Sequence, residues 1–239
     1  MKPKKTEGSS TKVIQALSKI SEAITSDLYV EDILKLIVAV TAEVMGSNIS
    51  SIQLLDKNTN ELVVKATQSI SEAYNKKPNM KLGEGIAGRV AKDGKPITVL
   101  DVRKDERYLN RDVAIKENLC SLLSVPLIFK GKVIGVLNCY TAQPHTFTKN
   151  ETDVLKSIAS QAAILIENFR LVVESKVIKE ELESRKAVER AKGILMKQEH
   201  ISEEEAYDRI RKYSMDNRRS MREVSEAIVL SNAMKSTKK

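Results

Sequence analysis

The stretch SLLSVPLIFKGKVIGVLNCY, residues 121–140, consists of two apolar runs separated by a short polar segment. SLLSVPLIF and VIGVLNCY have the length and the apolar character of β-strands. KGK between them contains the glycine that is typical of turns. The stretch therefore predicts two neighbouring strands with a short connection.

Upstream segments extend this pattern. SIQLLD (51–56) and ELVVKAT (61–67) flank the turn-rich KNTN, which predicts a β-hairpin, and ITVLDV (97–102) is a further strand candidate. Residues 12–26 and 30–46 have the apolar spacing of helices. The N-terminal part thus combines predicted strands with predicted helices.

The pattern changes from Thr148 onward, because neither glycine nor proline occurs before Gly193. This composition predicts one long helix. Ser202 followed by Glu205, and Ser220 followed by Glu223, match the capping box that starts a helix. We therefore expect a compact three-helix unit at the end of a long connecting helix.

The long helix carries an incomplete heptad repeat. Ile164, Leu171 and Ile178 recur every seven residues, but the accompanying positions are Asn168, Ser175 and Leu182. A seam that is only half apolar is typical of a weak coiled coil. We expect Leu171, Ile178 and Leu182 to form the contact of a homodimer.

The composition is that of a folded chain with a basic surplus. The 239 residues carry a formal net charge of +8, which favours anionic partners. Cys120 and Cys139 form no CxxC pair, so we expect neither a disulfide framework nor a metal site. This cysteine pattern is consistent with a reducing cytoplasmic compartment.

The same sequence offers no targeting or membrane segment. MKPKKTEGSSTK at the start is not followed by a continuous apolar run, so we predict that residues 1–11 form a disordered tail rather than a signal peptide. Residues 33–45 are the most apolar stretch, yet they are too short to span a bilayer and contain Lys35 and Glu43. We therefore expect a cytoplasmic protein without membrane contact.

The C-terminal residues resemble a known family. ERAKGILM (189–196), SEEEAYDRIRKYSMDNRRSM (202–221) and the helix that follows look like an ANTAR domain. The resemblance implies a three-helix module that binds paired RNA stem-loops in nascent transcripts as a dimer and prevents termination. His200 departs from the family, which usually has glycine at this helix junction; histidine reaches the left-handed backbone conformation more readily than most residues.

The N-terminal residues resemble a second family, the GAF domain. LGEGIAGRVAKDGKPITVLDV (82–102), the stretch 121–140 and FTKNETDVLKSIASQAAILIEN (147–168) carry the resemblance. It implies an α+β fold, in which an antiparallel sheet flanked by helices serves as a sensor, followed by the long connecting helix and the C-terminal ANTAR bundle. We expect the GAF domain over residues 12–170, a helical linker over 171–183 and the ANTAR domain over 184–239.

The signal that the sensor detects is not readable from the sequence. Asn75-Lys76 matches part of the cyclic-nucleotide signature, but the remaining residues of that signature are missing, so we interpret the pair as loop. We predict no cofactor, and the GAF ligand, a small molecule or a protein, stays unknown. The long connections 68–82 and 101–119 are where we expect the signal to act.

Gly193 interrupts a predicted helix, where glycine costs about 1 kcal/mol relative to alanine. On a helical wheel Lys186, Arg190, Gly193 and Lys197 form one stripe, and the apolar residues of this segment fall on another side. We expect the stripe to be exposed, with the glycine as a gap that a phosphate backbone or a second helix approaches. The candidate RNA-binding residues are Lys186, Arg190, Lys192, Gly193, Lys197, Arg209, Arg211, Lys212, Arg218 and Arg219.

On the next helix we place Ala206, Ile210 and Tyr213 in the core, and Met215 on the outward side. Two other functions compete with RNA binding. A three-helix unit with capped short helices also describes helix-turn-helix proteins that bind DNA. Some GAF-fold proteins reduce free methionine sulfoxide with cysteine thiolates, which makes Cys120 a candidate nucleophile. We prefer a regulator that is not an enzyme, and a structural role for Cys120.

Overall fold

The computed structural model describes residue 18 and residues 30–68 and 78–236, and it divides the chain into two compact units, residues 1–169 and 170–239. The tail 1–11, most of the helix expected at 12–26 and the Asn75-Lys76 pair lie outside the described residues. Each unit is taken below by itself.

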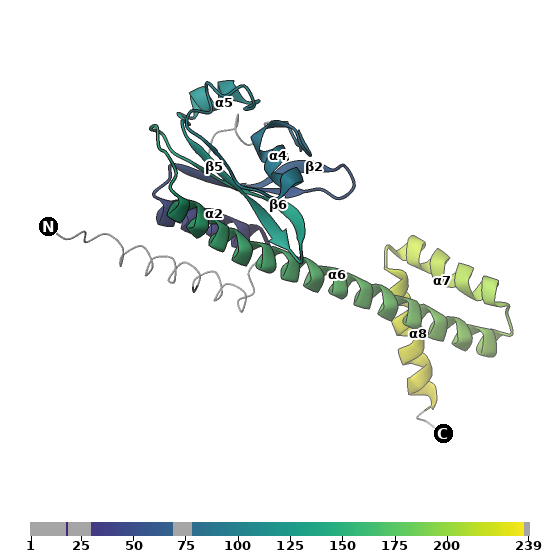
Figure 1. The fold of residues 1–239 in the computed structure, drawn as a ribbon. Helices are drawn as coiled ribbons and strands as arrows, with labels where there is room; N and C mark the ends of the chain where they lie inside the picture. Colours follow the sequence, from purple (N-terminus) through teal and green to yellow (C-terminus); the bar gives the residue numbers. More distant parts are fainter. Residues whose placement is uncertain (1–17, 19–29, 69–77, 237–239) are drawn as a thin grey trace. The chain divides into compact units, whose positions relative to one another are not determined.

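A six-stranded antiparallel sheet forms the centre of the N-terminal unit (Figure 1). The strand order is β3-β2-β1-β6-β5-β4. The strands are β1 (Ile49–Leu55), β2 (Glu61–Thr67), β3 (Met80–Lys81), β4 (Ile97–Val99), β5 (Leu122–Phe129) and β6 (Lys132–Tyr140). The five strands expected from the sequence are present, and the short β3 was not predicted.

The β5–β6 hairpin confirms the interpretation of residues 121–140. Its connection consists of Lys130 and Gly131, whose φ angles are 47° and 77°. Two-residue hairpins favour positive φ at both positions, because that backbone matches the twist of the strands. Glycine reaches this conformation without steric cost, whereas Lys130 does so at some cost.

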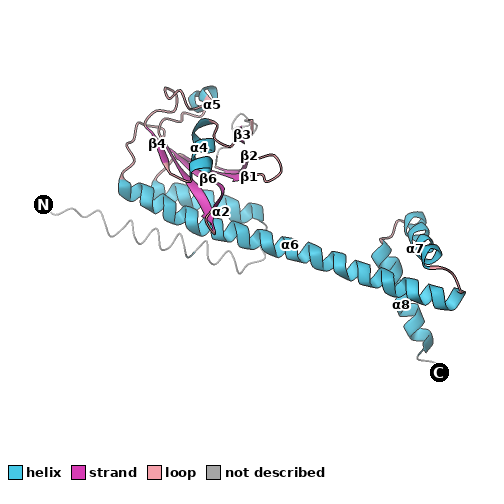
Figure 2. Ribbon diagram, turned by 45° about the vertical axis from the view of Figure 1, so that its right-hand side comes forward, coloured by secondary structure: helices cyan, strands magenta, loops and turns pink. Residues whose placement is uncertain are grey.

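Helices cover both faces of the sheet (Figure 2). Helix α2 (Val30–Met45) and the first part of α6 (Lys149–Glu199) pack on one face, where their apolar residues meet Ile52, Leu123 and Leu137. Helices α4 (Gly85–Asp93) and α5 (Arg111–Lys116) lie on the other face. The expected α+β fold is therefore confirmed.

Helix α4 was not predicted, because its sequence is spaced by glycines that usually indicate loops. The structure gives a reason for one of them. A Cβ atom at Gly88 would lie 2.4 Å from the carbonyl oxygen of Lys81, so only glycine allows the helix to approach the β3 backbone this closely. Helix α5 was also unpredicted and lies within the long connection 101–119.

The C-terminal unit contains the end of α6, then α7 (Glu203–Asn217) and α8 (Met221–Ser236). Both predicted capping boxes are present: Ser202 and Glu205, and likewise Ser220 and Glu223, each bond the other's backbone N–H. His200 ends α6 with φ of 55°, the left-handed conformation. The core of this unit consists of Ala191, Leu195, Ala206, Ile210 and Val224.

None of the helices in the described part of the chain combines the length and the apolar character needed to cross a membrane.

Candidate functional site

The predicted stripe on α6 lines a groove beside α8. Lys186 and Arg190 lie along one end of the groove, and Arg190, Gly193 and Lys197 along the other. Val229 of α8 faces both ends. The stripe is therefore exposed, as expected. It lies next to α8 and is not on a helix face without neighbours. We call this surface, Lys186, Arg190, Gly193 and Lys197 with Val229, the α6/α8 groove.

Gly193 leaves open space in the groove. A Cβ atom placed on it would have no atom of the described chain within 4 Å, apart from its own helical turn. No neighbouring helix therefore requires glycine at this position. The side chains of Lys186, Arg190 and Lys197 are exposed, and no described carboxylate forms an ion pair with any of these three cations.

Lys192, a further predicted RNA-binding residue, differs from the three cations of the stripe. Only 9% of its side chain is exposed, and its Nζ lies 2.8 Å from Glu189 Oε1 and 2.6 Å from Glu203 Oε1. The two hydrogen bonds raise the pKa of Lys192, and the bond to Lys192 lowers the pKa of Glu203. Lys192 thus joins α6 to the start of α7 through its two carboxylate partners.

The remaining candidates are spread over α7 and its end. Arg209 pairs with Glu199, and Arg219 Nη1 lies 3.4 Å from Glu223 Oε1. Arg218 has φ of 52° and closes α7 in a left-handed conformation. Arg211 and Lys212 are exposed on α7, without an ion pair among the described residues. The sequence candidates therefore differ in their partners: the groove cations have no carboxylate partner among the described residues, whereas Lys192, Arg209 and Arg219 do.

Arg222 of α8 is a groove residue that the sequence analysis missed. It lines the same end as Lys186 and Arg190, and its guanidinium pairs with Glu226 at 2.7 Å and with Glu183 at 3.3 Å. Hydrogen bonding to Glu226 raises the pKa of Arg222 further. The sequence shows that Arg222 follows the Ser220 cap and so lies on α8. It does not show that α8 crosses α6 at this point, which is why the contact with α6 was missed.

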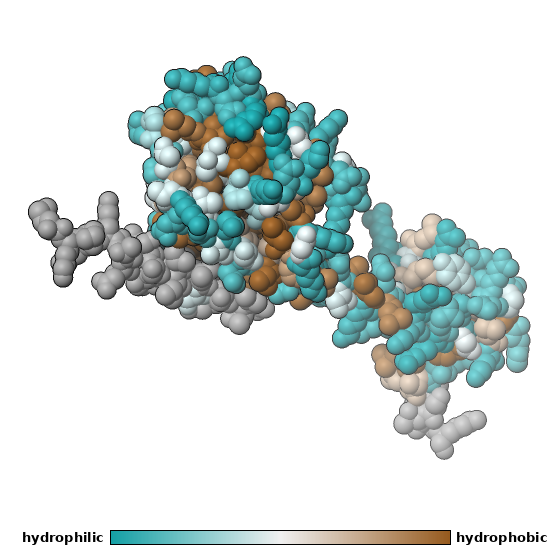
Figure 3. Space-filling view, in the orientation of Figure 1, coloured by the Kyte–Doolittle hydropathy of each residue, from teal (hydrophilic) through white to brown (hydrophobic). Residues whose placement is uncertain are grey.

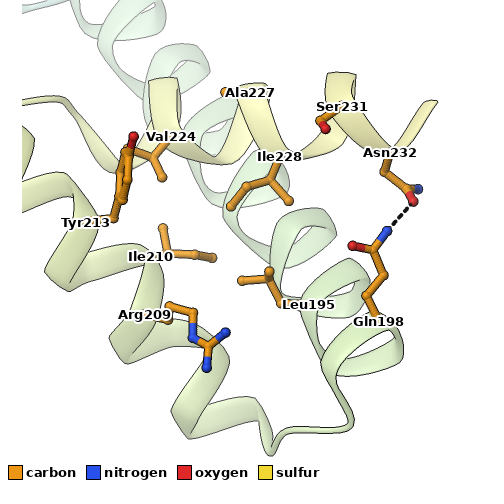
Figure 4. Close-up of a pocket in the computed structure, with 10 residues that line it drawn as sticks. All are labelled: Leu195, Gln198, Arg209, Ile210, Tyr213, Val224, Ala227, Ile228, Ser231 and Asn232. Carbon is orange, nitrogen blue, oxygen red and sulfur yellow. Dashed lines mark hydrogen bonds between the residues drawn. The ribbon is translucent and has the colours of Figure 1, made fainter. Parts of the chain in front are cut away.

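A second groove is lined by residues of α6, α7 and α8 (Figure 4). Leu195, Ile210, Val224 and Ile228 point toward one another there, and Gln198 Nε2 donates to Asn232 Oδ1 at 2.7 Å. Tyr213 stands at the rim of this groove with 58% of its surface exposed, so its prediction as a core residue is wrong.

The expected dimer seam is exposed in the single chain. Leu171, Ile178 and Leu182 are 46%, 64% and 50% exposed. Figure 3 shows a C-terminal unit with a largely hydrophilic surface, interrupted by scattered hydrophobic side chains. Met215, expected on the outward side of α7, is 68% exposed.

In the N-terminal unit both cysteine thiols are fully buried. Cys120 Sγ accepts a hydrogen bond of 3.2 Å from Arg103, whose guanidinium also donates to Asp101. The same sulfur lies 3.7 Å from the carbonyl oxygen of Leu100. Burial raises the pKa of Cys139 to about 11. A thiol without exposure is poorly placed to attack a dissolved substrate.

The connection 101–119 is more ordered than its length suggests. Bidentate hydrogen bonds from Arg103 lower the pKa of Asp101, and those from Arg107 lower the pKa of Asp105. Tyr108 of the same segment donates to the hydroxyl of Tyr140 on β6. The segment is thereby tied to the sheet. Most of the other connection, 68–82, lies outside the described residues.

Four uncharged polar side chains lie buried in the sheet beneath α4 and α5. Ser51 of β1 and Ser124 of β5 both pair with Asn138 of β6, and Gln53 is two residues further along β1. Their strand neighbours Ile52, Leu123 and Leu137 belong to the core under α2 and α6, so these four face the opposite side. We call Ser51, Gln53, Ser124 and Asn138 the polar band.

The polar band divides the apolar core on this side of the sheet. Along β6, Val136 belongs to one apolar cluster and Tyr140 to another, with Asn138 between them. Gln53 Oε1, Ser124 Oγ and Asn138 Oδ1 have no hydrogen-bond partner in the described structure. A buried polar atom without a partner costs about 1–3 kcal/mol. No sequence motif identifies this band, because it arises from strand register.

Residues 28–167 match the GAF domain family. The chain belongs to the GAF family. Residues 177–229 match the ANTAR domain, so an ANTAR domain follows the GAF domain. Both family resemblances drawn from the sequence are confirmed.

Two curated relatives each match about two thirds of this chain. The methyl sulfide methyltransferase-associated sensor of Methanosarcina acetivorans is 25% identical over 163 residues, which are 66% of this chain and 16% of that protein. The nitrogen fixation protein AnfA of Azotobacter vinelandii is 23% identical over 161 residues, again 66% of this chain and 30% of that protein. The chain thus spans less than a third of the length of either relative.

Solved structures also resemble a large part of the chain. The GAF domain of a phosphoenolpyruvate-protein phosphotransferase from Coxiella burnetii has a TM-score of 0.61 and 25% identity, covering 69% of this chain and 98% of that one. Free methionine-R-sulfoxide reductase from Neisseria meningitidis, in complex with its substrate, has a TM-score of 0.58 at 20% identity and covers 72% and 98% of the two chains. At that identity the second likeness concerns the fold alone.

Proposed function

We propose that this GAF and ANTAR protein is a signal-responsive RNA-binding regulator that binds stem-loops in nascent transcripts and promotes transcription antitermination. The ANTAR match over residues 177–229 supports the RNA-binding output, because the family resemblance implies it. The GAF match over residues 28–167 supports a sensory input. The protein acts in the cytoplasm, as a homodimer, and not as an enzyme.

The choice of the RNA-contacting surface rests on one observation. Lys186, Arg190 and Lys197 line one groove without carboxylate partners, around the open space at Gly193. Phosphate oxygens are recognised by exposed lysine and arginine, and a gap in the side-chain layer lets the nucleic-acid backbone come close. Hairpin RNA presents such a backbone together with splayed loop bases.

A competition experiment tests the class of partner. The full-length protein is bound to the hairpin RNA that co-purifies with it from its host, and a duplex DNA of matched length is added at equal concentration. We expect the RNA to stay bound. Displacement by the DNA would instead support a helix-turn-helix type of DNA-binding regulator.

The thiol-enzyme alternative is tested by Cys120→Ser. Since Cys120 is buried against Arg103, we expect the variant to bind RNA as the original chain does. Reduction of free methionine sulfoxide by the original chain, with its loss in Cys120→Ser, would contradict a purely regulatory role.

A further inference from the structure

The two ends of the α6/α8 groove differ in their carboxylates. At one end Arg190 and Lys197 lie around the open space at Gly193, and Glu189 lines the groove beside them. Glu189 accepts a hydrogen bond of 2.8 Å from Lys192, so this carboxylate already has a cation of its own. The cations that line this end are therefore available to an anionic ligand.

The other end contains two carboxylates and a third basic side chain. Glu183 and Glu226 line it together with Arg222, next to Lys186 and Arg190. Arg222 Nε donates to Glu226 Oε1 at 2.7 Å, and its Nη2 donates to Glu183 Oε2 at 3.3 Å. Glu226 lies one turn further along α8, whereas Glu183 belongs to α6. Arg222 is thus held by one carboxylate from each helix of the groove.

These two carboxylates resemble a phosphate ligand in their chemistry. The planar guanidinium group binds carboxylate and phosphate oxygens through the same pattern of N–H donors. While Glu226 and Glu183 accept from Arg222, those N–H groups are occupied and the positive charge is offset. Lys186 and Arg190 at the same end have no described carboxylate as ion-pair partner. One cation of this end is therefore engaged, and its two neighbours are free.

The ion pairs of Arg222 are accessible to solvent. The side chains of Arg222, Glu183 and Glu226 are 37%, 46% and 52% exposed. Exposed ion pairs contribute little to stability, because water and salt screen them. Separating Arg222 from Glu226 therefore does not require the helices to come apart, and a phosphate group competes with the carboxylate for the same donors.

We propose that Glu226 restrains RNA binding by holding Arg222, which would otherwise be a fourth phosphate contact beside Lys186, Arg190 and Lys197. Glu183 supports this restraint from α6. Carboxylates in the groove weaken the sequence-independent attraction of phosphates, and such repulsion is one way to favour a specific partner over others. The inference rests on the proposed function, the binding of RNA in this groove.

The first test is the salt dependence of hairpin RNA binding by full-length Glu226→Gln. This variant keeps the side-chain size and removes the charge. We expect about two- to fivefold tighter binding, because the exposed ion pair is weak, and a slope of log affinity against log salt that is steeper by roughly 0.7–0.9, the value of one added phosphate contact.

Glu181→Gln is the matched control for charge. Glu181 is an exposed glutamate of α6 that does not line the groove, so its variant should keep the original slope. An unchanged affinity and slope for Glu226→Gln, or an equal gain for Glu181→Gln, overturns the proposal.

A second comparison shows whether the gain passes through Arg222. Arg222→Gln is measured alone and combined with Glu226→Gln. We expect the same slope for both proteins, since no guanidinium remains that Glu226 could hold. Any loss of stability caused by Arg222→Gln is shared by the two proteins and cancels. If Glu226→Gln steepens the slope as much without Arg222, the lost negative charge acts by itself and the proposal is wrong.

Inorganic tripolyphosphate separates this inference from the proposed RNA function. Its binding to the full-length original chain and to Glu226→Gln is measured by calorimetry, and we expect about two- to fivefold tighter binding by the variant. This gain without hairpin RNA binding by either protein would contradict the RNA-binding output alone. Hairpin RNA binding that does not respond to Glu226→Gln would contradict the restraint alone.

Discussion

Gly193 leaves open space in the α6/α8 groove because it has no side chain. A Cβ atom placed there would have no atom of the described chain within 4 Å, apart from its own helical turn. Gly193→Ala should therefore raise the stability of the helix by about 1 kcal/mol. If RNA approaches the gap, the same methyl group should weaken RNA binding. Melting and RNA titration on this variant measure the two effects separately; higher stability with unchanged affinity would exclude a role for the gap in binding.

Lys192 shows how burial changes the role of a cation in the same helix. Its ammonium is held by Glu189 and Glu203, so Lys192→Gln should lower the melting temperature of the C-terminal unit. The salt dependence of RNA binding should stay the same, because the charge that is removed does not face the groove. A flatter salt dependence in this variant would show that Lys192 contacts phosphate after all.

At the scale of the element, the capping boxes make the starts of α7 and α8 sensitive to acid. Backbone and side-chain hydrogen bonds from Ser202 lower the pKa of Glu205, and those from Ser220 lower the pKa of Glu223. Because the folded pKa is the lower one, this stabilisation is present above the ordinary value of 4.5 and is lost as the pH falls through the folded pKa.

Ser202→Ala should therefore cost about 1 kcal/mol of stability at neutral pH. The difference between this variant and the original chain should shrink as the pH falls below about 4.5, since protonated Glu205 no longer accepts the two bonds. Urea unfolding at pH 7 and pH 3.5 measures both values. An equal difference at the two pH values would mean that the carboxylate contributes nothing to the cap.

The half-apolar seam on α6 motivates a prediction about assembly. We propose that the homodimer is weak and that the state of the sensor controls it. Replacing Asn168 and Ser175, both exposed, with leucine should complete the heptad seam and give a stable dimer whose RNA binding no longer responds to the signal. Sedimentation would show this directly; an unchanged monomer fraction would contradict it.

Elements were predicted where local chemistry specifies them. The β5–β6 hairpin follows from two apolar runs around Lys130-Gly131, and the starts of α7 and α8 follow from their capping boxes. Helix α4 was missed because it contains Gly88, which is unfavourable in a helix. The reason for this glycine is the close approach of the β3 backbone, and helix propensities do not include such tertiary contacts.

The candidate sites were predictable only in part, for the same reason. The wheel placed Lys186, Arg190 and Lys197 together because they share one helix. It gave no reason to expect that Glu203 reaches Lys192, that Arg222 enters the groove, or that Ser124 and Asn138 meet across β5 and β6, since these contacts depend on helix crossing and strand register.

At the scale of the whole molecule, we propose that the GAF and ANTAR protein acts through RNA held at the α6/α8 groove. Each lysine or arginine that neutralises a phosphate releases counterions, so its loss flattens the dependence of binding on salt. Exposed Lys179 of α6 does not line the groove and provides a control of equal chemistry.

The most direct measurement is the slope of log affinity against log salt for a hairpin RNA that co-purifies with the protein, with the original chain and the Lys186→Gln, Arg190→Gln, Lys197→Gln triple variant. We predict weaker binding by the variant and a slope reduced by roughly 0.7–0.9 for each of the three contacts. Lys179→Gln should leave the slope unchanged. A triple variant that binds with the original affinity and the original slope would contradict the groove as the RNA-binding surface.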